Sequence, residues 1–105
     1  MPFLHIDELA VRERLPGWHG RHFNSESMTF GHWEFEAGAS IHEHRHPEEE
    51  VWLPIEGELE VTVDGVTVAA GPGAVAIVPP DTRHSIRALG AGRAIVVDHP
   101  IRSDM

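Results

Sequence analysis

Residues 38–57 read GASIHEHRHPEEEVWLPIEG, with a glycine at each end and a dense run of histidine and glutamate between them. Successive side chains of a β-strand point to opposite faces, so residues two apart share a face. On a strand, His44 and His46 would project together, and a turn at Pro47 would bring Glu50 back to the same point. Imidazole nitrogens and a carboxylate oxygen suit first-row divalent metals. The stretch therefore predicts a metal site inside a small β-barrel.

The run from His42 to His46 contains two overlapping His-x-His pairs, and spacing alone accepts either pair as metal ligands. A further histidine, His84, lies in a second segment that is marked by glycine and proline. Glu48 and Glu49 are expected to face solvent or a neighbouring subunit. The residues themselves thus leave two ligand frames open.

Composition limits both the size of the core and the available chemistry. With 105 residues the chain is expected to form one domain, residues 1–105. It has no cysteine, tyrosine or lysine, so thiolate, Schiff-base and tyrosine chemistry are excluded and His, Glu, Asp and a metal remain. The formal charge of −9 argues against a nucleic-acid partner, which needs basic patches.

The first residues, 1–14, carry acids and arginines too early for a signal peptide. No apolar run approaches the length of a membrane span. We therefore expect a cytoplasmic protein without a membrane partner.

Short apolar segments alternate with glycine and proline along the rest of the chain. A helical turn is expected only at Asp7–Val11, with Asp7 as the cap. Leu59–Val68 alternates apolar and polar residues around Asp64-Gly65, which predicts a hairpin. Ala74–Val78 predicts a fully buried strand. Pro54 predicts an edge position or a bulge. Eight or nine such strands indicate an all-β sandwich or barrel.

The intervals between glycine, histidine and glutamate resemble the first motif of the cupin family: Gly, five residues, His-x-His, three or four residues, Glu, six residues, Gly. The residues that fit every interval are Gly38, His44, His46, Glu50 and Gly57. A frame that starts at His42 places neither glycine. The resemblance therefore selects the second His-x-His pair.

Residues 73–88 resemble the second cupin motif, with five residues between Gly73 and a Pro-Pro-Asp turn, and two residues between Asp81 and His84. The family has glycine where this chain has Asp81, and asparagine where it has Ala88. Aspartate tolerates the left-handed turn conformation, so the turn is still expected. The missing asparagine removes no ligand.

The resemblance implies an antiparallel jelly-roll β-barrel that binds one divalent transition metal: Mn, Fe, Ni, Zn, Co or Cu. The implied ligands are His44, His46, Glu50 and His84. His42 and Trp52 share strand parity with these ligands, so we expect them to line a substrate pocket. No catalytic residue is assigned.

Three functions fit such a site. The first is a metal-dependent enzyme, a sugar-acid isomerase or ring-opener or an oxygenase, that acts on a small oxygen-rich acid. The residues 100–104, PIRSD, resemble the closing segment of pectin-degradation proteins that open unsaturated uronates. The second is a non-catalytic module that binds a small ligand or a metal. The third is a regulatory sensor, which would need a DNA-binding partner.

The expected partner is a small molecule with carboxylate or hydroxyl groups. Four arginines are candidates to bind its carboxylate, and the sequence does not rank them: Arg21, Arg83, Arg87 and Arg102.

We also expect a homodimer, because a small barrel has sheet edges to cover. The expected dimer surface contains Trp18, Phe23, Met28 and Phe30. Trp33 and Phe35 are expected to face the core, and His5, His19 and His22 to lie at the surface.

Overall fold

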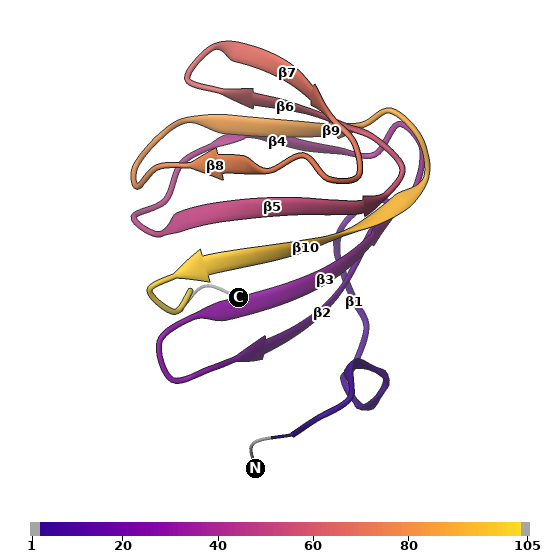
Figure 1. Ribbon diagram of the computed structural model, residues 1–105, viewed down its shortest axis with the longest axis vertical. Helices are drawn as coiled ribbons and strands as arrows, with labels where there is room; N and C mark the ends of the chain where they lie inside the picture. Colours follow the sequence, from indigo (N-terminus) through magenta and orange to yellow (C-terminus); the bar gives the residue numbers. More distant parts are fainter. Residues whose placement is uncertain (1–2, 104–105) are drawn as a thin grey trace.

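The computed structural model describes residues 3–103 as a short 3-10 helix followed by ten β-strands (Figure 1). The helix η1 covers Ile6–Glu8. The strands are β1 (Arg12–Leu15), β2 (Trp18–Asn24), β3 (Thr29–Phe35), β4 (Ser40–His44), β5 (Glu49–Glu56), β6 (Leu59–Val63), β7 (Val66–Ala70), β8 (Ala76–Val78), β9 (His84–Ala88) and β10 (Gly92–His99).

The strands form two sheets in which neighbouring strands are antiparallel. One sheet has six strands in the order β1-β2-β3-β10-β5-β8, and the other has four in the order β4-β9-β6-β7. The last strand, β10, lies between β3 and β5, and β4 pairs with β9. These crossovers between distant strands produce the all-β jelly-roll architecture that the sequence predicts.

The core lies between the two sheets and is built by alternation along the strands. The six-stranded sheet contributes Trp18, Trp33 and Trp52, with the Trp18 ring 6.2 Å from Trp33 and 5.9 Å from Trp52 in edge-on contacts. The other sheet contributes Leu59, Val61 and Ile86. The predicted inward orientation of Trp33 and Phe35 is confirmed. The expectation that Trp18 lies on a dimer surface is wrong, because it is 1% exposed and fills the centre of this core.

Two predicted features of the turns and strands are confirmed. Asp64 and Gly65 join β6 to β7 with φ angles of +49° and +81°, as a two-residue hairpin requires. The pairing of β5 with β10 shifts register between Arg93 and Ala94, opposite Pro54. The proline therefore lies at a β-bulge. The regular pattern of hydrogen bonds between the strands is already interrupted there, so a missing backbone N–H is tolerated.

The N-terminal turn differs from the prediction in position and in its cap. It is the 3-10 helix Ile6–Glu8, and its cap is His5, whose Nδ1 accepts a hydrogen bond from the backbone N–H of Asp7. An imidazole nitrogen thus takes the capping role that a carboxylate usually plays. No helix in residues 3–103 has the length and apolar character needed to cross a membrane.

The segment Ala74–Val78 is also less buried than expected. Only its last three residues form β8, and Ile77 is 58% exposed. The reason is topological, because β8 is the outermost strand of the six-stranded sheet. Val78 alone is fully buried, and the outward-facing apolar side chains remain on the surface.

Candidate metal centre

The predicted ligands come together because four strand ends meet at the same end of the molecule. β4 ends there, β5 and β9 begin there and β10 ends there, on the left in Figure 1. The backbone N–H of Asp81 donates to the carbonyl of His46 at 2.8 Å, which ties the β8–β9 loop to the β4–β5 loop. Asp81 has a φ of +55°, the left-handed conformation expected of the residue that replaces glycine.

A bulge in β4 sets the orientation of its histidine. Ile41 pairs with Ile86 and His44 pairs with His84, so two residues of β4 lie opposite one residue of β9. The extra residue turns both Ile41 and His44 toward the interior, although their spacing of three would separate them on a regular strand. The His44 and His84 rings then lie 4.3 Å apart between centroids.

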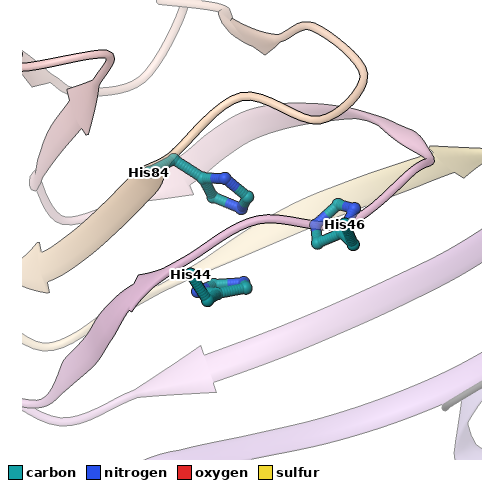
Figure 2. Close-up of side chains that lie close together, drawn as sticks. All are labelled: His44, His46 and His84. Carbon is teal, nitrogen blue, oxygen red and sulfur yellow. The ribbon is translucent and has the colours of Figure 1, made fainter.

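Three histidines form a compact cluster in which the rings turn toward a common space (Figure 2). One nitrogen from each of His44, His46 and His84 lies within 4.8 Å of the others. Each Nδ1 contacts a backbone carbonyl: that of His42 for His44 at 2.8 Å, of Glu48 for His46 at 3.0 Å, and of Thr82 for His84 at 2.8 Å. A carbonyl only accepts, so every Nδ1 carries a proton, and Nε2 is the nitrogen through which each neutral ring can bind a metal.

Glu50 lies beside these free nitrogens. Its two carboxylate oxygens are 3.2 Å from Nε2 of His46 and 3.3 Å from Nε2 of His84. Both nitrogens are buried, and neither makes a well-aligned hydrogen bond within the described residues. The Trp52 indole donates a hydrogen bond to the Glu50 carboxylate. The group thus combines oriented imidazoles, a carboxylate and two buried nitrogens without a hydrogen-bond partner among the described residues.

The electrostatics favour a positive charge at this point. Burial alone raises the pKa of Glu50, but contacts with His46 and His84 and the Trp52 hydrogen bond outweigh burial and hold that pKa below its usual range. Contact with Glu50 in turn raises the pKa of His46, against the effect of burial. Burial lowers the pKa of His44 and keeps it neutral, the form that binds metals.

The sequence analysis missed a second carboxylate at the centre. Asp98 lies opposite Glu50 in the pairing of β10 with β5, and its carboxylate is close enough to share an ion with Glu50 and His46. Burial, together with the negative charge of Glu50, raises the pKa of Asp98 to about 8. One signal was present: Asp98 continues the inward alternation of Ala94 and Val96, where a charged residue is unusual.

The structure separates the four candidate arginines. Arg102 contacts the centre, with Nη1 3.4 Å from Glu50 and 3.7 Å from Asp98, and Nε 3.5 Å from Glu48. The other three pair with carboxylates away from the centre: Arg21 with Asp7, Arg83 with Glu43, and Arg87 with Glu60. The expectation that Glu48 faces solvent is wrong, because its side chain is 13% exposed and contacts both His46 and Arg102.

A cavity of about 330 Å³ opens beside the cluster. His42 and Trp52 both line it, together with His44, Glu50 and Arg102. Core side chains form the remaining wall, so an apolar surface faces a small set of polar groups, as is typical of small-molecule sites. Whether His42 and Trp52 contact a substrate stays a prediction.

The fold and the site define a class of protein: an antiparallel β-barrel with a buried histidine cluster that could hold a metal. The cupin domain family, Cupin_2, matches residues 31–100, which is 70 of 105 residues and includes all of the predicted ligands. The chain belongs to this family.

Solved structures of cupins match the chain over nearly its whole length. An RmlC-like cupin from Shewanella frigidimarina has a TM-score of 0.92 at 25% identity, covering 99% of this chain and 95% of that one. KdgF from Halomonas sp. has a TM-score of 0.92 at 23% identity, covering 100% and 98%. Oxalate decarboxylase from Bacillus subtilis, a protein with Mn(II) centres, has a TM-score of 0.80 at 23% identity, covering 92% of this chain and 29% of that one.

A curated relative is similar over part of the chain. It is the uncharacterised HTH-type transcriptional regulator YobQ of Bacillus subtilis, 27% identical over 62 residues. The match includes 59% of this chain and 26% of the regulator, so the chain corresponds to about a quarter of that protein.

Proposed function

We propose that the protein binds one divalent transition metal through His44, His46, His84 and Glu50, and that it is a metal-dependent enzyme for a small oxygen-rich acid. One observation carries the metal site: the three imidazoles cluster with each Nδ1 against a backbone carbonyl, and the Nε2 atoms of His46 and His84 lie 3.2 and 3.3 Å from the Glu50 carboxylate. This donor set fits Mn, Fe, Co, Ni, Cu or Zn. The Mn(II) centres of the structurally similar oxalate decarboxylase support manganese as one candidate.

The remaining residues suit an acid that carries several oxygens. Bound in the cavity, the metal would supply a Lewis acid for a carbonyl, or an O2-binding centre if it is iron or copper. Arg102 places a guanidinium beside Glu50, where it can orient a carboxylate of the substrate. Trp52 and the core side chains exclude water from one wall. The structural match to KdgF supports the sugar-acid branch of this proposal, in line with the resemblance to uronate ring-opening proteins.

A turnover screen tests the enzymatic part. Metal-loaded protein would be assayed with unsaturated uronates, hydroxy acids and keto acids, and for O2 consumption with each. We expect turnover with one class, and loss of metal and turnover together in His44→Ala, since that change removes a proposed ligand. Full turnover by His44→Ala would contradict the proposal. His99→Ala is the control, because this histidine is exposed and does not belong to the cluster.

A second candidate is a module that binds metal or ligand without turnover. The similarity to part of an HTH-type regulator supports it, because such a module could report a small molecule to a DNA-binding segment. It predicts that the screened acids bind to the metal-loaded protein and stay unchanged. Product formation with any of them would favour the enzyme.

A further inference from the structure

A second cavity, of about 340 Å³, lies between the N-terminal segment and the end of the β2–β3 hairpin. Its lining residues are Leu9, Ala10, Arg12, Arg14, His22, Phe23, Asn24, Thr29 and Arg102. Arg14 and Arg102 line the first cavity as well, so the two cavities adjoin. Neither the histidine cluster nor the proposed reaction uses Arg12, Arg14 or His22.

The charge of this lining contrasts with the rest of the protein. The chain carries a net charge of −9, yet three of its eight arginines line this cavity, and no described residue among its walls is acidic. Arg102 shares its charge with Glu48, Glu50 and Asp98 on the side of the metal centre. Arg12 makes no ion pair within residues 3–103. Among the described residues, the lining of this cavity therefore carries positive charge and no acidic side chain.

The pairing of β1 with β2 places the arginines at this cavity. Arg12 and Arg14 both belong to β1, and both line this cavity, with a register shift of the β1–β2 pairing between Glu13 and Leu15. Arg12 pairs with Gly20 across the β1–β2 ladder. A side chain at Gly20 would collide with the His22 and Trp33 rings, so the glycine leaves the room in which His22 packs edge-on against Trp33.

The pKa of His22 reflects its burial and the positive charge around it. The sequence places His22 among surface residues, but the side chain is half-buried, and its Nε2 is buried without a hydrogen-bond partner within the described part of the chain. Burial lowers the pKa of His22, and the charges of Arg14, Arg12 and Arg102 lower it further. A proton is disfavoured beside these arginines, and an anion would be favoured for the same reason.

We propose that the second cavity binds a small oxyanion, a carboxylate or a phosphate, held by the guanidinium groups of Arg12 and Arg14. Guanidinium donors match the planar oxygens of carboxylate and phosphate and bind them in pairs. His22 and Asn24 border the same space and can contribute side-chain nitrogen donors. This site stands independently of the metal centre, although an anion bound there would lie next to the metal cavity.

The test titrates inorganic phosphate and malonate into the intact chain at constant ionic strength set with chloride. Calorimetry measures affinity, and ¹⁵N NMR of the histidine rings follows His22. We expect at least one anion to bind and to raise the pKa of His22, because the anion offsets the arginine charges. Preference for phosphate would identify a phosphorylated ligand, and preference for malonate a carboxylic acid.

Matched variants locate the binding. Arg12→Gln should weaken binding roughly tenfold, the loss typical of one charge-assisted contact. Arg87→Gln removes the same charge from the four-stranded sheet and should change affinity by less than about twofold, because solvent and salt screen distant charges. Metal content should be equal in Arg12→Gln and wild type. The proposal is overturned if neither anion differs from chloride, or if Arg87→Gln weakens binding as much as Arg12→Gln.

Discussion

Trp52 links the hydrophobic core to the metal centre. One side of its indole packs against Trp18, while its Nε1 donates to the Glu50 carboxylate. Glu50 and Trp52 alternate with Val51 on β5, so both face inward. Loss of a group that orients a metal ligand typically costs about 10- to 100-fold in metal affinity or activity.

Trp52→Phe should therefore lower metal affinity by about 10- to 100-fold while the barrel remains folded. The phenyl ring keeps most of the apolar contact but has no donor for Glu50. Competition with a chelator measures the affinity. Trp33→Phe is the matched control, since Trp33 is also a core tryptophan but has no hydrogen bond to Glu50. Equal losses in the two variants would show that packing, and not the hydrogen bond, matters.

His22 gives the protein a predictable sensitivity to acid. Its pKa in the folded state is lowered by burial and by the arginines, whereas in the unfolded chain it is close to 6.5. The neutral ring thus favours the folded state above pH 6.5. That contribution is lost as the pH falls below 6.5 toward the lower folded pKa, because the unfolded chain takes up the proton first.

His22→Gln should make the free energy of unfolding less dependent on pH between about 7 and 5. Urea denaturation at several pH values measures the slope for wild type, His22→Gln and the control His5→Gln, which alters an exposed histidine. A slope that stays the same in His22→Gln would contradict the assigned burial of this ring.

The predicted ligands of the site were within reach of the sequence, whereas its surroundings were not. The resemblance to the two cupin motifs selects His44, His46, Glu50 and His84, and the structure brings these side chains together. Asp98 and Arg102 reach the centre because β10 pairs with β5. These segments are distant in the sequence, so spacing along the chain does not predict the contact.

At the scale of elements, the β8–β9 loop holds His84 in place through its turn at Asp81. That residue adopts a φ of +55°, and its N–H holds the carbonyl of His46. Glycine adopts this conformation without cost, aspartate tolerates it and a β-branched residue does not.

Asp81→Val should lower the free energy of unfolding by about 1–2 kcal/mol and weaken metal binding, because the turn must distort. Asp81→Gly should stay within about 1 kcal/mol of wild type and keep its metal. Urea denaturation and metal analysis of the two variants provide the comparison. Equal stability of the two would show that the turn does not require a left-handed residue.

Local pattern predicted the strands better than their burial. The hairpin at Asp64-Gly65 is where the alternation places it, but Val66 and Val68 of β7 are 66% and 60% exposed. β7 lies at the edge of its sheet, so apolar residues there have no neighbour to cover them. The bulge in β4 was also not predictable from local pattern. It arises in the pairing of β4 with β9, and no residue type in β4 indicates it.

At the scale of the whole molecule, the outer face of the six-stranded sheet carries one apolar row of side chains. Strand register aligns one row of side chains across five strands: Phe23, Phe30, Val97, Val51 and Ile77. The Phe23 and Phe30 rings stack at 5.1 Å. A standard interface buries about 800 Å² per partner, which is roughly an eighth of the 6194 Å² surface. We propose that a second copy of the chain covers this face.

Light scattering should then give twice the mass of one chain, and Phe30→Glu should give a single chain, since a carboxylate within the row would be buried without a partner. Val68→Glu is the control, because it places the same charge on the exposed edge of the other sheet. A single-chain mass for wild type would refute the homodimer.

The central claim is that the histidine cluster holds a metal ion, and elemental analysis of protein purified without chelator or nickel resin tests it most directly. We predict about one transition-metal ion per chain in the wild type and in His42→Ala, and nearly none in His46→Ala or His84→Ala. Wild-type protein that stays metal-free even after exposure to Mn, Fe, Co, Ni, Cu and Zn salts would contradict the claim. So would full metal content in His84→Ala.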